Sequence, residues 1–214
     1  LALPVMPRGN YQFNAQFTRE AGDEGVSLVL PVGGRQLLCV LGGYPQLGFV
    51  SGLSQIDDKE APYNQTAIKG SKLFNGKLND VTADVQFDQR RDEVRVRVTL
   101  NGAVIIDWAG TTSQLTDDSW NSTDDVRKLG LAAQNSVVAF HSAHVKMNSG
   151  DAAVLWPQSY DARREAATKL LALGAKLIVA QDGQRKLISA VDALGPGEFQ
   201  ILSVDASATE FTDV

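Results

Sequence analysis

The clearest pattern along this chain is a strict alternation of apolar and polar residues. It recurs in three segments, residues 11–17, 81–87 and 94–100. A period of two places alternate side chains on opposite faces of a strand, so one face is buried and the other is exposed to solvent. These segments predict β-strands that each cover one side of a hydrophobic core.

Turn signals separate further strands between residues 11 and 149. Gly33-Gly34 lies between the apolar runs 26–30 and 36–41, and Asn101-Gly102 lies between 94–100 and 104–106. Both dipeptides favour the positive φ angles of tight hairpins. Two more strands are expected at 129–133 and 137–146. Many short strands joined by such turns predict a mainly β protein, an antiparallel jelly-roll sandwich.

Two long polar segments interrupt this pattern. Residues 42–79 and 111–127 are rich in turn formers and contain few apolar runs. Long ordered loops on a rigid sheet scaffold often carry binding residues. The alternative reading is that both are surface connections.

The pattern changes near residue 150. Residues 161–173 are rich in Ala, Leu, Arg and Lys, with Asp161 placed to cap the start of a helix and Gly174 its end. Short strands are expected at 176–180, 187–191 and 199–204. The sequence therefore predicts two domains, a β-sandwich at 1–149 and a small helix-led α/β segment at 150–214.

Several short motifs carry a likeness to known families. They are Phe17-Thr18-Arg19, Leu30 to Gln36, Ser51-Gly52-Leu53, Ile56-Asp57, Leu100-Asn101-Gly102, Trp108-Ala109-Gly110, Leu129-Gly130-Leu131 and Phe140-His141-Ser142. In their order and spacing, they resemble the concanavalin A-like or laminin-G-like sandwich of large multidomain bacterial proteins. The region is also distantly similar to the sandwich of sugar hydrolases.

The tail resembles the entry to a leucine-rich repeat array. Leu170 to Ala175 looks like a capping helix, Phe199 to Asp205 like a repeat strand, and Thr212-Asp213 like the following turn. A solenoid needs about three repeats, because each buries its face only against its neighbours. We therefore expect a piece of a longer protein, whose tail packs on the sandwich or forms a homodimer with a second copy.

Composition narrows the function classes. The chain is 43% hydrophobic with a formal net charge of -5, which suits a globular protein and argues against nucleic acid as a partner. No run reaches the roughly 18 to 20 apolar residues of a membrane helix, so no direct membrane insertion is expected. The lone Cys39 lies in an apolar run and reads as a buried hydrophobe. The compartment stays open, with an extracytoplasmic or cell-envelope location favoured.

Catalytic groups are not evident in the pattern. Glycoside hydrolysis needs two facing carboxyl groups, but Asp80, Asp84 and the turn acids Glu20, Asp23 and Glu24 read as solvated charges. The two histidines, His141 and His144, fall on opposite faces of a strand unless a bulge intervenes. We therefore expect no enzyme activity and no resident cofactor. Calcium binding remains an alternative, because the loops contain acidic pairs such as Asp57-Asp58.

Loop aromatics and nearby polar groups are the candidate ligand contacts. Aromatic rings stack on the apolar faces of sugars, and polar side chains fix the hydroxyls. The candidates are Arg35, Tyr44, Tyr63, Asn64, Trp108, Trp120 and Asn135. The alternative interpretation of Trp108 is that its side chain fills the core of the sandwich.

These observations favour a non-catalytic binding or adhesion module that recognises a carbohydrate or cell-surface ligand within a larger protein. The alternatives are a protein-interaction or spacer region of a receptor-like protein, with a protein ligand, and a glycoside hydrolase-like enzyme. The last follows only from the distant likeness of fold.

Overall fold

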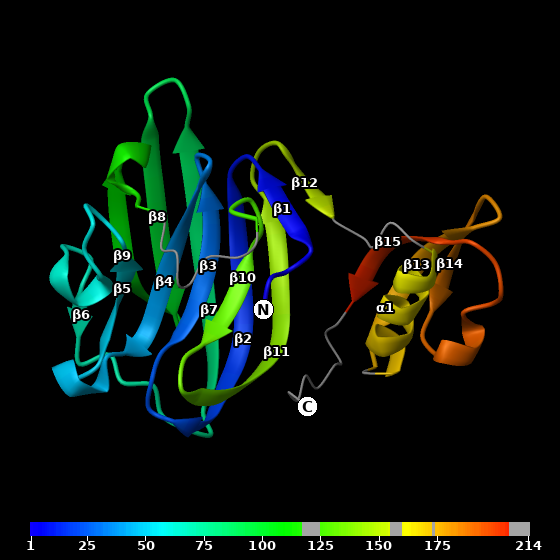
Figure 1. Cartoon of the computed structure of the whole chain (residues 1–214), viewed down its shortest axis with the longest axis horizontal. Helices are drawn as coiled ribbons and strands as arrows, with labels where there is room; N and C mark the ends of the chain where they lie inside the picture. The colour runs from blue at the N-terminus through cyan, green and yellow to red at the C-terminus, as the bar shows by residue number, and fades with distance from the viewer. Residues whose placement is uncertain (117–124, 155–159, 173, 206–214) are drawn as a thin grey trace.

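A computed structural model describes residues 1–116, 125–154, 160–172 and 174–205 of the chain. The body consists of two five-stranded antiparallel sheets (Figure 1). The first sheet has the order β10-β3-β4-β5-β6 and the second the order β11-β2-β7-β8-β9. The prediction of a mainly β, antiparallel protein with a β-sandwich is confirmed.

Most strands of these sheets were predicted, with small shifts in their bounds, whereas β5 and β6 lie in the segment 42–79 that was expected to be a loop. The first sheet contains β3 (Val26–Val32), β4 (Arg35–Gly43), β5 (Val50–Ser54), β6 (Ile68–Lys69) and β10 (Gly130–Ala133). The second contains β2 (Tyr11–Gly22), β7 (Leu78–Asp88), β8 (Glu93–Leu100), β9 (Ala103–Gly110) and β11 (Ser136–Met147). A short pair, β1 (Val5–Arg8) and β12 (Asp151–Val154), lies outside both sheets.

The core fills the space between the two sheets. Inward side chains of alternating strands meet there, including Phe13, Phe17 and Leu28, each 0% exposed. Phe13 lies opposite Ala83 in the β2–β7 register, and Leu28 lies opposite Cys39 in the β3–β4 register. The period-two pattern therefore places the apolar residues on the inner faces, as the sequence predicts.

Strands β3 and β4, like β5, are covered on both faces. Leu28 and Cys39 point into the core, whereas Val29, Leu38 and Val40 form a separate apolar cluster. An antiparallel strand that is apolar without interruption is typical of burial on two sides. The continuous runs at 26–30 and 36–41 have this origin, and the covered outer face carries the candidate site.

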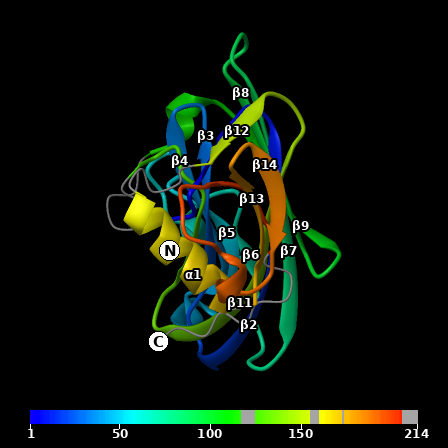
Figure 2. The same cartoon turned by 90° about the vertical axis from the view of Figure 1, so that its right-hand side faces the viewer.

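The C-terminal residues form a second small core. Helix α1 (Tyr160–Ala172) packs on the antiparallel sheet β14-β13-β15 (Figure 2), formed by β13 (Lys176–Gln181), β14 (Gln184–Ile188) and β15 (Gln200–Asp205). Gly174 follows the helix with a φ of 89°, the positive angle expected of a C-terminal cap. The predicted domain boundary near 150 stays a prediction.

The expected start of a leucine-rich repeat array is not shown. Strand β13 pairs antiparallel with both β14 and β15, whereas repeats stack equivalent strands in one direction. A short helix followed by a hairpin carries similar leucine spacing, which explains the misleading likeness. Thr212-Asp213 lies outside the described residues.

Candidate functional site

The outer face of the first sheet bears an apolar patch that a loop partly covers. Val29, Leu38 and Val40 are at most 8% exposed and cluster with Ala61 of the 3-10 turn η2 (Ala61–Tyr63). The half-buried side chain of Tyr44 packs against the same cluster. The long segment after β5 therefore turns back over the sheet instead of extending into solvent.

Beside this patch lies a groove of about 240 Å³, which we name the outer groove. Leu38 and Val40 form its apolar floor, and Tyr44 contributes an aromatic ring. Its polar lining consists of Glu24, Ser27, Gln46, Ser54, Glu60 and Gln134. Polar surface exceeds apolar surface in this lining, so the outer groove is a polar groove with a small apolar floor.

Glu24 is held in place at the rim of the outer groove. Its Oε2 accepts a hydrogen bond of 3.3 Å from the backbone N–H of Tyr44. Tyr44 itself has a φ of 56°, a left-handed conformation that costs a non-glycine residue free energy. Strained residues of this kind cluster at functional sites; Phe49 (φ 65°) is strained in the same loop, and Gln55 (φ 64°) is strained directly after β5.

Asn64 anchors the loop that carries Glu60. Its Nδ2 donates to the carbonyls of Leu53 (2.8 Å) and Glu60 (3.1 Å), and its Oδ1 accepts from the N–H of Thr66 (2.9 Å). Gly52 makes room for this loop, since a Cβ there would lie 3.2 Å from that of Ala61. Asn64 was predicted to bind ligand, but the structure gives it this supporting position.

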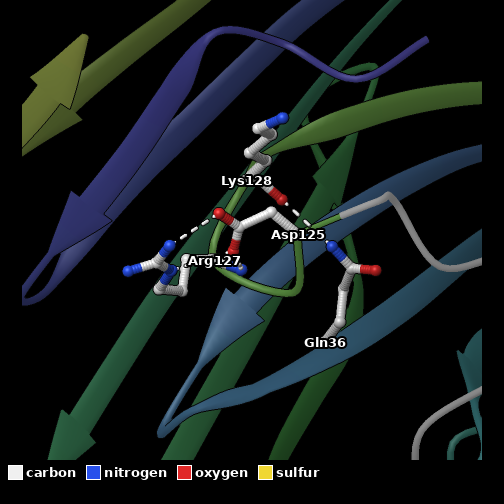
Figure 3. Close-up of polar contacts among 4 residues, drawn as sticks. All are labelled: Gln36, Asp125, Arg127 and Lys128. Atoms are coloured by element: carbon white, nitrogen blue, oxygen red, sulfur yellow. Dashed lines mark hydrogen bonds and ion pairs between the residues drawn. The ribbon is translucent and has the colours of Figure 1, made fainter. Parts of the chain in front are cut away.

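A second loop reaches the outer face of β4 at Gln36 (Figure 3). The Gln36 amide, 6% exposed, donates to the carbonyl of Lys128 at 3.2 Å. The turn before it is fixed by Arg127, whose Nε and Nη2 donate to the two oxygens of Asp125 at 2.9 and 2.8 Å. These bonds hold the pKa of Asp125 well below its ordinary value, so the pair remains charged at neutral pH.

The other predicted ligand residues lie elsewhere. Arg35 lines a separate hollow of about 130 Å³ beside Gly33 and Gly34. Tyr63 is 64% exposed and lies outside the outer groove lining, and Asn135 follows Gln134 in the β10–β11 turn.

Trp108 is 5% exposed and belongs to the core, which agrees with its alternative interpretation as a core residue. Trp120 lies outside the described residues. Of the seven candidates, Tyr44 alone lines the outer groove in the described part of the chain.

The sequence pattern did not single out Glu24 and Glu60 as site residues. Glu24 reads as a turn acid, and Glu60 has no motif around it. The available signal was the continuous apolar character of 36–41, which indicates a second covered face on β4.

A larger hollow of about 380 Å³ lies on the outer face of the second sheet, but its composition is that of a solvated surface. Polar side chains line it throughout, among them Asp84, Arg95, Arg97 and Asp107. Arg97 pairs with Asp107 at 3.6 Å, and Gln86 donates to Asp84 at 2.9 Å. Exposed pairs of this kind satisfy one another, and no apolar floor or aromatic ring accompanies them.

The described residues contain no group of three or more His, Cys, Asp or Glu side chains that could hold a metal ion. Asp57 and Asp58, considered for calcium, instead accept hydrogen bonds from Gln114 (3.2 Å) and Thr116 (2.7 Å). His141 lies at an irregularity of β11 and contacts the Thr18 hydroxyl at 2.9 Å. Within the same described part, no helix is long and apolar enough to cross a membrane.

Comparison with known proteins gives little. No family model matches the sequence, and no curated protein matches it. A similar solved structure is that of a mutant of the GH43 protein BlXynB from Bacillus licheniformis, with 12% identity and a TM-score of 0.37. The match covers 64% of this chain and 27% of that protein's chain.

This likeness is too slight to argue for an activity. The prediction that the chain is not an enzyme is corrected on another ground. That prediction depended on acids within single strands, whereas Glu24 and Glu60, which lie far apart in the sequence, line one groove.

Proposed function

We propose that the outer groove binds a carbohydrate and that the sandwich is of the concanavalin A-like jelly-roll class. The observation that carries the proposal is the position of Tyr44, next to the apolar floor of Leu38 and Val40 and among polar side chains. A sugar ring has apolar C–H faces and a hydroxyl rim, so it needs this combination of surfaces. The two facing antiparallel sheets support the proposed class.

The polar lining supplies both donors and acceptors for hydroxyl groups. Gln46 and Gln134 each offer an amide, Ser27 and Ser54 offer hydroxyls, and the glutamates accept only. Leu38, Val40 and Ser54 lie on strands, and the sheet fixes their backbone. The floor is therefore largely preformed, which lowers the entropy cost of binding.

A glycan array followed by calorimetry on the full chain tests the proposal. We expect Tyr44→Ala to weaken binding of the selected oligosaccharide about tenfold, because stacking contributes about 1 kcal/mol beyond burial. The matched control is Tyr63→Ala, which removes an exposed ring outside the groove lining and should leave affinity unchanged. Silence across broad glycan panels, or equal affinity of Tyr44→Ala and the parent, would remove the proposal.

One observation favours a second candidate, hydrolysis of a glycosidic bond. Glu24 and Glu60 project into the same groove, and such hydrolysis uses a pair of carboxyl groups on either side of the bond. Incubation with a panel of aryl glycosides and oligosaccharides is the test. Turnover that Glu24→Gln and Glu60→Gln each reduce at least a hundredfold would support it, and turnover insensitive to both would exclude these residues.

A further inference from the structure

The outer groove has a one-sided charge. Glu24 and Glu60 are the charged side chains of its lining, and no Lys or Arg is among the described residues that line it. The buried Arg19, which is 1% exposed, donates to the backbone carbonyl of Glu24 and interacts electrostatically with its carboxylate. The lining therefore presents negative charge to a ligand, although Arg19 offsets part of the charge of Glu24.

The two carboxylates come from different loops and are held differently. Glu24 is half-buried and fixed by the N–H of Tyr44, whereas Glu60 is exposed at the start of η2, on the loop that Asn64 anchors. Holding the Glu24 side chain in advance reduces the entropy lost when it forms an ion pair. Asn64 fixes the backbone of Glu60, and both glutamates line the same groove as Tyr44.

We propose that the outer groove selects cationic sugars, oligosaccharides of hexosamine units with free amino groups, over neutral and acidic ones. The inference deepens the proposed carbohydrate binding and rests on it. An ammonium group on the sugar ring donates hydrogen bonds to Glu24 or Glu60 while the ring contacts Tyr44, and a cation near an aromatic face gains further attraction. A uronate in the same place faces like charge, which disfavours binding.

Calorimetry on the full chain compares three oligosaccharides of equal length at one pH and one salt concentration. They are a β-1,4-glucosamine oligomer, the matching cello-oligosaccharide and an oligogalacturonate. The first two share a backbone and differ at C2, so their difference isolates the amine. We expect the glucosamine oligomer to bind at least about fivefold more tightly than the neutral one, and the uronate more weakly than either.

Charge variants locate the effect. Glu24→Gln and Glu60→Gln keep size and an acceptor oxygen but remove charge, so each should reduce the preference and the double variant should abolish it. Glu165→Gln is the matched control, because it makes the same change on helix α1, where Glu165 pairs with Lys169 at 2.7 Å. Added salt should narrow the preference in the parent and leave the double variant unchanged.

The outcomes separate the two proposals. Equal binding of the neutral and cationic oligomers, tighter binding of the uronate, or a preference that survives in the double variant overturns the cationic selectivity and leaves carbohydrate binding in place. Absence of binding to all three oligomers and to the glycan array overturns both.

Discussion

The buried guanidinium of Arg19 donates a hydrogen bond from Nη1 to the backbone carbonyl of Glu24 at 2.8 Å. The same group donates from Nε to Asn75 Oδ1 at 2.7 Å and from Nη2 to the carbonyl of Leu73. One side chain thus connects β2, the β2–β3 turn and the segment before β7. Because Glu24 in turn accepts from Tyr44, the position of the groove rim depends on Arg19.

Replacing Arg19 should destabilise the sandwich strongly. Arg19→Met keeps an apolar stem but removes the guanidinium bonds to Asn75 and to the carbonyls of Leu73 and Glu24, which costs about 3 kcal/mol in total. The Glu24 carbonyl keeps its bond from the Ser136 hydroxyl. Urea denaturation followed by tryptophan fluorescence would measure the free energy of unfolding. The matched control is Arg91→Met at a surface position, where the side chain is 77% exposed and the expected change is within about 0.5 kcal/mol.

Arg19→Lys distinguishes hydrogen-bond geometry from charge. Lysine keeps the charge but lacks the planar fork that reaches three acceptors, so it should recover only a small part of the loss. Equal stability of the Lys variant and the parent would show that the charge alone matters. Similar losses for Arg19→Met and Arg91→Met would show that the buried bonds add nothing.

Asn64→Ala should loosen one loop without unfolding the sandwich. The substitution removes the donors to Leu53 and Glu60 and the acceptor for Thr66, at a cost of about 1 to 3 kcal/mol. Hydrogen exchange read by mass spectrometry should become faster in residues 55–67 and stay unchanged in β7 and β8. Gln65→Ala, an exposed neighbour, is the control. Unchanged exchange in the loop of Asn64→Ala would contradict the anchoring role.

Gly52→Val should displace the same loop by a different route. A Cβ on Gly52 would lie 3.2 Å from both the Ala61 Cβ and the Thr66 hydroxyl, so larger side chains force the loop outward. We expect faster exchange in residues 55–67 and a loss of about 1 to 3 kcal/mol in stability. Gly195→Val is the control for crowding, because a Cβ there would meet no atom closer than 3.9 Å and, as at Gly52, the φ is not positive. Equal losses for Gly52→Val and Gly195→Val would contradict crowding as the cause.

The strands of the sandwich could be predicted because their burial follows a local rule. In β2, β7 and β8 the alternation of residues reports directly which face is buried, and Asn101-Gly102 marks the hairpin between β8 and β9. Strands β5 and β6 had no such signal, because Val50–Ser54 contains Gly and Ser and is buried throughout. Its strand character comes from pairing with β4, which sequence periodicity does not report.

The candidate site was predicted less well because it depends on contacts between distant segments. Glu24 and Glu60 come from different loops, and only the folded sheet brings them to one groove. Trp108 shows the opposite case: an aromatic residue near a loop in sequence lies on the inner face of β9, since its neighbours Asp107 and Ala109 take the outer face. The tail showed that leucine spacing alone does not distinguish a repeat from a helix followed by a hairpin.

Cys39 makes the stability of the sandwich depend on alkaline pH. Burial, with no exposed surface, raises the pKa of its thiol from 9.0 to about 12. Between these values the unfolded chain loses the thiol proton while the native chain keeps it, so the native state binds more protons. The free energy of unfolding therefore falls as pH rises through this window, by about 1.4 kcal/mol per pH unit.

Denaturation at several pH values between about 8 and 11 would measure this slope in the parent and in Cys39→Ala. The variant loses a constant amount at all pH values because of the cavity, but its slope should be smaller above pH 9.0. Tyr11, whose pKa burial raises well above 10.0, contributes a further decline in both proteins. The native thiol should also fail to react with a thiol reagent until urea unfolds the chain. Parallel curves for the two proteins, or a thiol that reacts at once in the native state, would contradict a buried, protonated Cys39.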